Sequence, residues 1–297
     1  MGEMNIYIDG KYYPKAQAKI SVYDHGLLYG DGIFEGIMIY DGNIYRLNSH
    51  LERLYESAKT IMLTIPMNID EMRNACVATV RKNGLRDAYI RLMVTRGVGD
   101  LGLDPRKCSR ATVIIIVDNI KMFPAEYYIK GLELATVPTT RNMSDALNPK
   151  IKSLNYLNNI MAKLEANNMG VPEGLLLNSQ GYVTEGTGDN IFIVRDQILQ
   201  TPPTYDGALA GITRSSIIYM AKDLGYKCEK KTLTRHDIYN AEECFLTGTA
   251  AELIPVVKID GRVIGAGKPG PIFKKLLVEF RKLTKKDGYQ AYGKKGK

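Results

Sequence analysis

The chain is poor in the residues on which disulfide frameworks, zinc sites and histidine-based catalysis depend. Its 297 residues include four cysteines and three histidines, and no two cysteines have the C-x-x-C spacing of a zinc or redox motif. The longest core-like apolar run, Val113 to Val117, is strand-sized and far shorter than the roughly 18 residues of a membrane helix. No secretory leader pattern opens the chain. We therefore expect no metal site, no membrane contact and a cytoplasmic location.

Positive charge is concentrated at one end of the chain. The net charge is +8, and seven cations against a single acid from Arg281 onward account for +6 of it. A solvated, frayed tail explains this pattern better than a phosphate-binding groove, and no RNA- or DNA-binding motif accompanies it. We expect no nucleic-acid partner.

Length and patterning predict an α/β chain of about two domains. Three Asp-Gly pairs between β-rich runs predict tight hairpin turns: Asp9-Gly10, Asp41-Gly42 and Asp260-Gly261. Apolar periodicity and capping residues predict five helices, which begin near Asn48 or Ser49, Ile69, Ser153, Thr213 and Pro271. The packed face of the third is expected to contain Leu154, Leu157, Met161 and Leu164. We expect a small N-terminal domain over 1–120, a linker over 121–131 and a larger domain over 132–297.

One glycine motif is misleading. Gly97-Val-Gly99-Asp-Leu-Gly102 has the G-x-G-x-x-G spacing of a dinucleotide-binding turn, which must be followed directly by a helix. Only Leu103 to Arg110 precede the next strand, and they include a proline, so the connection is too short for a parallel crossover. We predict antiparallel strands joined by a glycine loop, and no nicotinamide cofactor.

Three segments carry the chemistry: Pro149-Lys-Ile-Lys152-Ser-Leu-Asn-Tyr156, Tyr182-Val-Thr-Glu185-Gly-Thr-Gly-Asp-Asn190 and Leu246-Thr-Gly248-Thr249-Ala250. With His25-Gly-Leu-Leu-Tyr29 and Phe34-Glu-Gly36, and in this order, they resemble the fold-type-IV pyridoxal-phosphate aminotransferases, specifically the branched-chain amino-acid aminotransferases. The resemblance covers nearly the whole chain. It implies a two-domain fold whose larger domain is a pseudo-barrel, pyridoxal 5'-phosphate as cofactor, and amino transfer from Leu, Ile or Val to 2-oxoglutarate.

Such a reaction needs a lysine amine that attaches to the cofactor and moves a proton. Lys150 and Lys152 lie two residues apart, so along an extended chain both could point the same way, and spacing does not choose between them. The family motif places this lysine directly before Ser-Leu-Asn, which implies Lys152. It also lies just ahead of a predicted helix N-terminus, whose positive end favours the neutral amine.

The resemblance implies the remaining site residues. Glu185 would face the pyridine nitrogen and Tyr156 the phenolic oxygen, and the phosphate would be bound by Arg53, Ile212, Thr213 and Thr249. The substrate would contact Tyr29, Phe34, Gly36, Tyr89, Arg91, Gly188, Thr249 and Ala250. The loop 97–103 would reach a neighbouring subunit, which implies at least a homodimer.

One position departs from the family pattern. Met38 stands where the family commonly has Arg or Lys, so a cation is lost and the range of substrate side chains stays open. D-amino-acid aminotransferases, R-amine aminotransferases and aminodeoxychorismate lyases share this architecture and are the alternatives.

Overall fold

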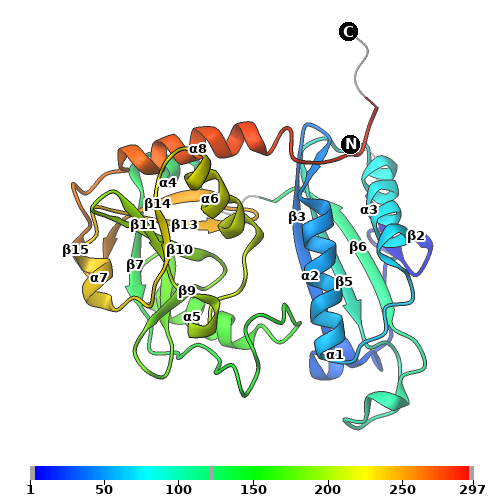
Figure 1. Ribbon diagram of the computed structural model, residues 1–297. Helices are drawn as coiled ribbons and strands as arrows, with labels where there is room; N and C mark the ends of the chain where they lie inside the picture. Colours follow the sequence, from blue (N-terminus) through cyan, green and yellow to red (C-terminus); the bar gives the residue numbers. More distant parts are fainter. Residues whose placement is uncertain (1–3, 121–122, 294–297) are drawn as a thin grey trace. The chain divides into compact units, whose positions relative to one another are not determined.

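A computed structural model describes residues 4–120 and 123–293, which form two compact units (Figure 1). Of these residues, the first unit contains 4–120, 151–155 and 283–293, and the second contains 123–150 and 156–282. Neither the predicted linker nor the predicted end of the second domain matches this division. Part of the linker forms helix α4 (Ala125–Lys130) in the second unit, where its Tyr128 hydroxyl donates to the Ala251 carbonyl at 3.1 Å.

The basic tail is bound to the first unit rather than frayed over its described length. Strand β16 (Gly288–Gln290) pairs with β4 (Asn43–Tyr45), because that strand would otherwise be an open sheet edge. The Asn43 side chain also donates to the Thr284 carbonyl at 2.7 Å, and Ala291 is fully buried. The tail cations Lys294, Lys295 and Lys297 lie outside the described residues.

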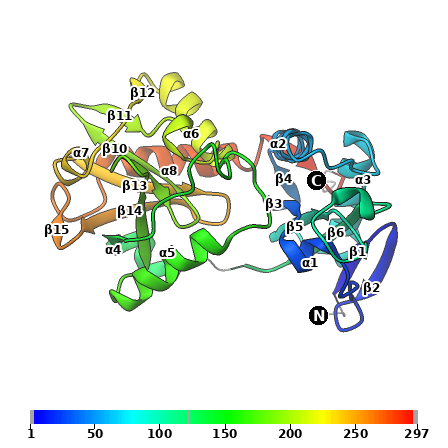
Figure 2. The ribbon, with the colours of Figure 1, turned by 90° about the horizontal axis from the view of Figure 1, so that it is seen from below.

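The first unit is an antiparallel sheet of seven strands in the order β16-β4-β3-β5-β6-β1-β2. Its other strands are β1 (Asn5–Ile8), β2 (Lys11–Pro14), β3 (Gly32–Tyr40), β5 (Ala88–Thr95) and β6 (Thr112–Asp118). Helices α2 (Leu47–Thr60) and α3 (Ile69–Asn83) lie side by side on one face of this sheet (Figure 2), and α1 (His25–Tyr29) precedes β3. Their buried apolar side chains form the core with the inward face of the sheet.

Local sequence signals account for several boundaries in this unit. The predicted helix from Ile69 is confirmed: the Asn68 side chain accepts the N–H groups of Asp70 and Glu71, and Gly84 ends the helix at φ 67°. Both residues of each predicted Asp-Gly turn have positive φ, which confirms the tight turns. Strands β5 and β6 pair antiparallel, as predicted. Helix α2 instead starts at Leu47, which is buried, ahead of the predicted caps.

The second unit is a mixed sheet in the order β12-β11-β10-β13-β14-β7-β8-β9, with β15 paired to β14. Its strands are β7 (Leu132–Thr136), β8 (Glu173–Leu177), β9 (Val183–Gly186), β10 (Asn190–Arg195), β11 (Ile198–Thr201), β12 (Cys228–Lys230), β13 (Glu243–Gly248), β14 (Glu252–Ile259) and β15 (Arg262–Val263). Strand β9 is the last strand in this order, and β13, β14, β7 and β8 separate it from β10. In the chain, however, only three residues connect β9 to β10. This short connection requires the sheet to curl, which gives the predicted pseudo-barrel.

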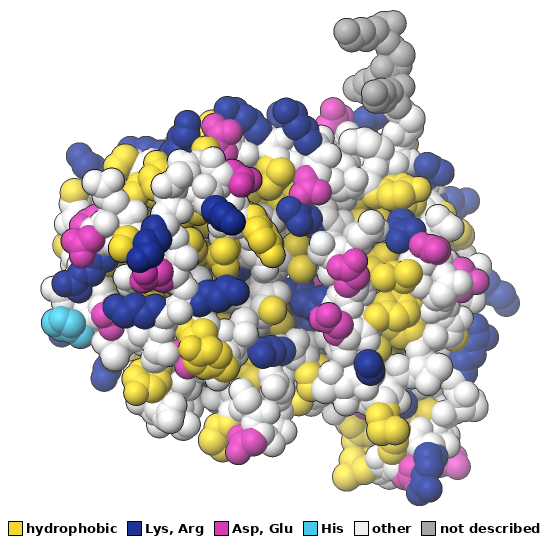
Figure 3. Space-filling view, in the orientation of Figure 1, with side chains coloured by type: hydrophobic (Ala, Val, Ile, Leu, Met, Phe, Trp, Pro, Cys, Tyr) yellow, Lys and Arg dark blue, Asp and Glu magenta, His cyan; other side chains and the backbone are white. Residues whose placement is uncertain are grey.

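Helices cover the curled sheet on different sides (Figure 1): α5 (Leu157–Asn168) packs on β8, α6 (Ile212–Asp223) on β13, and α8 (Pro271–Leu283) through Phe273 on Phe245. Helix α7 (Arg235–Tyr239) precedes β13. Acidic and basic side chains are interspersed on the face that Figure 3 shows. Among the described residues, no helix has both the length and the apolar character needed to cross a membrane.

Helix α5 corrects two predictions. It begins at Leu157 rather than just after Ser153, because residues 152–154 are extended and hydrogen-bond to β3 instead. Leu157, Met161 and Leu164, expected to line its packed face, are 68%, 45% and 50% exposed, whereas its buried residues are Asn159, Ala162 and Ala166. The small alanines allow close approach to the sheet, and the apolar stripe faces outward.

Candidate active site

Lys152 lies in an extended segment beside the first part of β3. Strand β4 pairs only with Ile39 and Tyr40 at the other end of β3, so this part is left open on that side. The Phe34 N–H donates to the Lys152 carbonyl and the Leu154 N–H to the Gly32 carbonyl, both at 2.9 Å. In this antiparallel pairing Lys152 is opposite Phe34, so both side chains lie on one face, and the Lys152 Nζ is 4.5 Å from the Phe34 ring centroid. Lys150 is exposed and belongs to the second unit, whereas Lys152 is half-buried. The two candidate lysines therefore have different environments. Because α5 starts five residues after Lys152, the helix-dipole argument for its amine does not apply.

The same face of the sheet carries four of the predicted substrate residues. Gly36 pairs with Arg91, and the Arg91 guanidinium lies 4.6 Å from the Phe34 ring centroid and 5.5 Å from that of Tyr89. A Cβ at Gly36 would lie 2.0 Å from the Tyr89 hydroxyl, so only glycine permits this approach. Met38 pairs with Tyr89 on this face. The surface beside Lys152 is thus aromatic and apolar, with the Arg91 guanidinium as its charged group.

The fifth predicted substrate residue of this unit, Tyr29, is tied to the glycine loop. Its hydroxyl accepts the Gly102 N–H at 2.9 Å, and its ring packs edge-on against His25. The His25 Nε2 in turn contacts the Asp100 carbonyl at 3.0 Å. Two contacts from α1 therefore hold the 97–103 loop, while Leu103 in that loop is 82% exposed.

Arg53, the predicted phosphate arginine, is part of a buried cluster on the opposite face of β3. The Glu35 carboxylate accepts Nε and Nη2 of Arg53 at 2.7 and 2.8 Å, one on each oxygen, and His50 Nδ1 lies 2.7 Å from Oε2. All three residues are less than 10% exposed. Glu35 takes two of the five N–H donors of Arg53, and this fork fixes the guanidinium plane.

Electrostatics assign the protonation states in this cluster. Burial alone would raise the pKa of Glu35, but the adjacent Arg53 and His50 hold that pKa well below its usual range. Burial also lowers the pKa of His50, against the opposing effect of Glu35. The ionised carboxylate can only accept, so a neutral His50 donates from Nδ1. Sequence reasoning missed Glu35 and His50, although an acid between the buried positions Ile33 and Ile37 of one strand is a signal for a buried partner.

A second cluster surrounds Glu185 in the second unit. Glu185 Oε1 accepts Nε and Nη2 of Arg141 at 3.0 and 2.8 Å, and Oε2 accepts the Asn190 side-chain amide at 3.1 Å and the Leu209 N–H at 2.9 Å. Glu185 and Arg141 are 5% and 6% exposed. Because all four contacts come from donors, they stabilise the ionised carboxylate. Arg141 is a residue that sequence reasoning missed.

The turn after Glu185 lies close to the two segments that were predicted to bind the cofactor phosphate and the substrate. A Cβ at Gly211, the N-cap of α6, would lie 2.0 Å from Asn190 Oδ1, and a Cβ at Gly248 would lie 1.7 Å from Asp189 Oδ1. These two glycines let the turn approach both the start of α6, with Ile212 and Thr213, and the Thr249–Ala250 turn. Glu185 is therefore in the same part of the unit as both predicted binding segments.

The remaining predicted residues of this unit lie nearby in the chain. Tyr156 is half-buried at the N-cap of α5, and Gly188 is exposed in the turn after Glu185. The N-cap Gly211 provides no side-chain acceptor for the first N–H groups of α6, and the first turn has no acid, so this helix end suits an anion. Burial lowers the pKa of the neighbouring Arg214, whose guanidinium donates to the Pro202 carbonyl at 2.9 Å.

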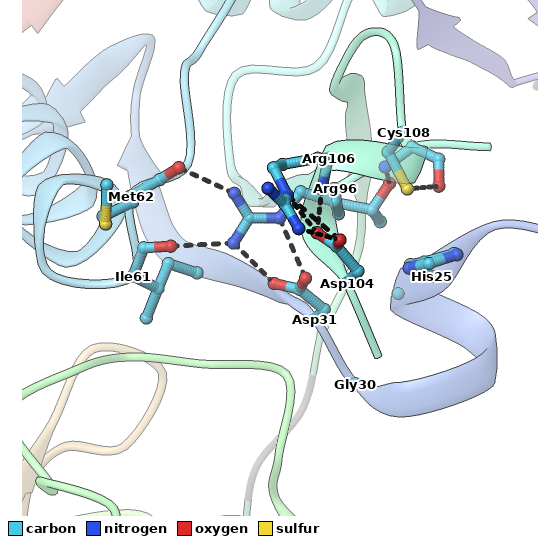
Figure 4. Close-up of polar contacts among 12 residues, drawn as sticks. His25, Gly30, Asp31, Ile61, Met62, Arg96, Asp104, Arg106 and Cys108 are labelled. Atoms are coloured by element: carbon cyan, nitrogen blue, oxygen red, sulfur yellow. Dashed lines mark hydrogen bonds and ion pairs between the residues drawn. The ribbon is translucent and has the colours of Figure 1, made fainter. Parts of the chain in front are cut away.

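One cavity in the first unit is lined by none of the predicted site residues. It measures about 390 Å³ and is lined by residues of the 105–111 segment, the 62–66 segment and Arg96. Figure 4 shows the Arg96 guanidinium between Asp31, which it meets with two N–H groups, and the carbonyls of Ile61 and Met62. Arg96 thereby joins the end of β5 to the end of α2, which is a structural role.

Comparison with known proteins identifies the family. The model of the amino-transferase class IV family matches residues 32–259. The chain belongs to the class IV aminotransferases. A Methanocaldococcus jannaschii protein with a provisional branched-chain-amino-acid aminotransferase name is 51% identical over 97% of this chain and 99% of its own.

The fold of this class IV aminotransferase is similar to that of solved structures over nearly the whole chain. The Escherichia coli branched-chain amino acid aminotransferase has a TM-score of 0.93 at 34% identity and covers 98% of both chains. A second branched-chain amino acid aminotransferase, the T.th. enzyme with pyridoxamine 5'-phosphate, has a TM-score of 0.91 at 38% identity, over 96% of this chain and 95% of its own. The same T.th. enzyme was solved with N-(5'-phosphopyridoxyl)-L-glutamate. The predicted two-domain fold-type-IV architecture is confirmed.

Proposed function

We propose that this class IV aminotransferase transfers the amino group of a branched-chain L-amino acid to 2-oxoglutarate, with pyridoxal 5'-phosphate as cofactor. The products are the branched 2-oxo acid and L-glutamate. The observation that best supports this is the half-buried Lys152 amine on a sheet face with Phe34, Tyr89 and Arg91. An amine, an apolar surface and a guanidinium together suit a substrate pair of which one side chain is aliphatic and the other carries a carboxylate.

The residues present fit the cofactor. Lys152 offers an amine, Glu185 an ionised carboxylate for the pyridine nitrogen, and the start of α6 an anion-binding helix end for the phosphate. Arg53 adds a cation that Glu35 already orients. When bound, pyridoxal phosphate supplies an electron-withdrawing ring that stabilises negative charge at the substrate α-carbon.

Each of these residues has a defined task. Lys152 Nζ would hold the cofactor covalently and, once the substrate amine has replaced it, would accept the proton from the substrate α-carbon. Glu185 would present its negative charge to the pyridine nitrogen, and Tyr156 would donate to the phenolic oxygen. Thr249 and Thr213 add hydroxyl and N–H donors for the phosphate.

The residues that we assign to the substrate come from several segments of the chain. We assign the turn N–H groups of Thr249 and Ala250, and the Tyr89 hydroxyl, to the α-carboxylate. We assign Phe34, Gly36 and Tyr29 to the aliphatic side chain of the substrate, and we also assign Gly188 to substrate binding. Since Met38 provides no charge, Arg91 is the residue we assign to the glutamate side chain.

Separate half-reactions test the proposal. Purified protein with pyridoxal phosphate is mixed with L-leucine, D-alanine or an R-configured aromatic amine, and the cofactor absorbance is followed over time. The fastest change is expected with L-leucine. A faster reaction with D-alanine or the amine would assign the chain to another activity of the same family. No reaction with any of them would overturn the aminotransferase function.

We also propose a cytoplasmic homodimer as the working form. The exposed apolar side chains of the 97–103 loop, Leu101 at 61% and Leu103 at 82%, support a second copy as its partner. Light scattering at micromolar concentration is expected to give at least twice the chain mass, and replacing Leu103 with Asp is expected to reduce it. A monomer mass for the active protein would exclude this assembly.

A further inference from the structure

We propose that Arg141 is a positioning residue for Glu185, which keeps the negative charge on that carboxylate so that the proton stays on the pyridine nitrogen of the cofactor. This inference rests on the proposed function. It assigns a task to a residue that makes no contact with the substrate in the proposed site.

The geometry of Arg141 is the first support. It lies in the irregular segment between β7 and α5, yet its guanidinium is fixed from two sides. Nε and Nη2 donate to Glu185 Oε1, and Nη1 donates to the side-chain oxygens of Asn158 and Asn159 at 3.1 and 3.2 Å. At 6% exposure, the group has exchanged water for these contacts. A planar cation held at three nitrogens has one orientation.

The same contacts fix the carboxylate. Asn159 also donates to the carbonyl of Thr187, two residues after Glu185, at 2.7 Å, and the Asn190 amide donates to both Glu185 Oε2 and the Leu209 carbonyl. The network therefore connects the start of α5, the turn after β9 and the segment before α6. Arg141 is the only group among these partners that carries charge, so it has the strongest effect on where a proton resides.

The direction of that effect follows from charge. A proton shared by a carboxylate and a pyridine nitrogen can lie on either atom. Arg141 touches the carboxylate oxygen at 2.8 Å, so it stabilises the state with the anion on Glu185 and the proton on nitrogen. Buried Arg214 also acts on Glu185 electrostatically, but it donates hydrogen bonds to Thr201 and Pro202.

The test measures the protonation of the pyridine nitrogen directly. Wild type, Arg141→Met and Arg141→Lys are loaded with ¹⁵N-labelled pyridoxal phosphate, and the ¹⁵N chemical shift is recorded at neutral pH together with the cofactor dissociation constant. Arg141→Met should still bind cofactor, with its nitrogen signal moved toward the unprotonated position by a population change of about 10- to 1000-fold. Arg141→Lys keeps the positive charge but loses the paired N–H donors of the guanidinium. Its ¹⁵N chemical shift should lie between those of wild type and Arg141→Met. A wild-type signal in both variants would overturn the inference.

A control variant separates this effect from loss of an ion pair near the same turn, here one whose lysine is half-buried. Lys163 contacts Glu173 at 3.3 Å, and Glu173 accepts the Thr187 N–H on the same turn. Lys163→Met should lower the melting temperature and leave the ¹⁵N shift unchanged; a shift equal to that of Arg141→Met would show a merely structural role for Arg141. If Arg141→Met does not fold, Arg141→Lys against Lys163→Met decides in the same way. Failure of the proposed function is distinct, because wild type would then not react with L-leucine.

Discussion

Each unit contains a buried carboxylate–arginine cluster, and the two clusters use the same groups in opposite ways. In the first unit Glu35 orients Arg53, the group we assign to the phosphate; in the second, Arg141 orients Glu185, the group we assign to the ring nitrogen. Arg53 meets both oxygens of its carboxylate, whereas Arg141 meets one and leaves the other to Asn190 and the Leu209 N–H. Breaking the first cluster leaves a buried cation without its counter-charge, so we expect lost stability. Breaking the second is expected to alter chemistry.

Lys152 is the residue that we assign to the reaction itself, so its replacement is expected to have a larger effect than a change in either cluster. Lys152→Ala is expected to abolish transamination and leave the melting temperature close to that of wild type. Borohydride treatment of the cofactor-loaded protein, followed by peptide mapping, should label Lys152 alone. Lys150→Ala is the matched control and should keep both label and turnover. Label on Lys150, with turnover in Lys152→Ala, would reverse the assignment.

Glu185→Gln tests the chemical half of the comparison. The amide keeps the shape but removes the negative charge, so the single-turnover rate with L-leucine should fall by about 10²- to 10³-fold while cofactor remains bound. Glu173→Gln removes a buried charge beside the same turn, and its rate should be unchanged. Equal rates in Glu185→Gln and wild type would mean that another group faces the ring nitrogen.

Glu35→Gln tests the stability half. Removing one partner of a buried ion pair costs about 3–5 kcal/mol, so the free energy of unfolding in urea should fall by about that amount. The cofactor dissociation constant should rise, because Arg53 loses its fixed plane. Asp104→Asn breaks the exposed pair with Arg106 and serves as the control, with little expected change. A stable Glu35→Gln protein with weak cofactor binding would give this cluster a purely functional role.

His50 and Glu35, the two titratable acid–base groups of the first cluster, should affect the free energy of unfolding in different ranges of acid pH. His50 has a pKa below its ordinary 6.5, so its contribution is present above pH 6.5 and is lost as pH falls toward its lowered pKa. Glu35 also has a lowered pKa, so its contribution is present above about pH 4.5 and is lost only at lower pH.

The matching experiment follows unfolding free energy against pH in wild type and His50→Asn. The variant can still donate to Glu35, and it should lose the slope between pH 6.5 and 5 while keeping the one below pH 4.5. Each unit of pKa difference corresponds to about 1.4 kcal/mol. An unchanged slope near pH 6 in His50→Asn would assign that titration elsewhere.

Arg91→Leu should have the smallest effect. The glutamate half-reaction should slow roughly tenfold more than the leucine half-reaction, since only glutamate loses a charge-assisted hydrogen bond. Leu, Ile and Val should stay within roughly 10- to 200-fold of one another, because one methylene is worth only about 1–3 kcal/mol. Equal slowing of both half-reactions would show that Arg91 shapes the site instead of binding the carboxylate.

Short-range signals account for what the sequence determined alone. Asn68, Glu71 and Gly84 specify helix α3 because each acts within a few residues on its own backbone. The Asp-Gly turns are equally local. The motif around Lys152 indicated the family and cofactor, since its residue order is readable without knowing what lies nearby.

Tertiary structure decided what depends on partners distant in the chain. Residues 152–154 are extended because the open edge of β3 offers them hydrogen bonds, and β16 forms because β4 does the same. Arg141 and Glu185 are 44 residues apart, and no local pattern at either position indicates the other. The sequence thus determined the family and the groups that we assign to the chemistry. The fold determined the buried partners of those groups, because a buried charge is stable only where another element supplies its counter-charge and hydrogen bonds.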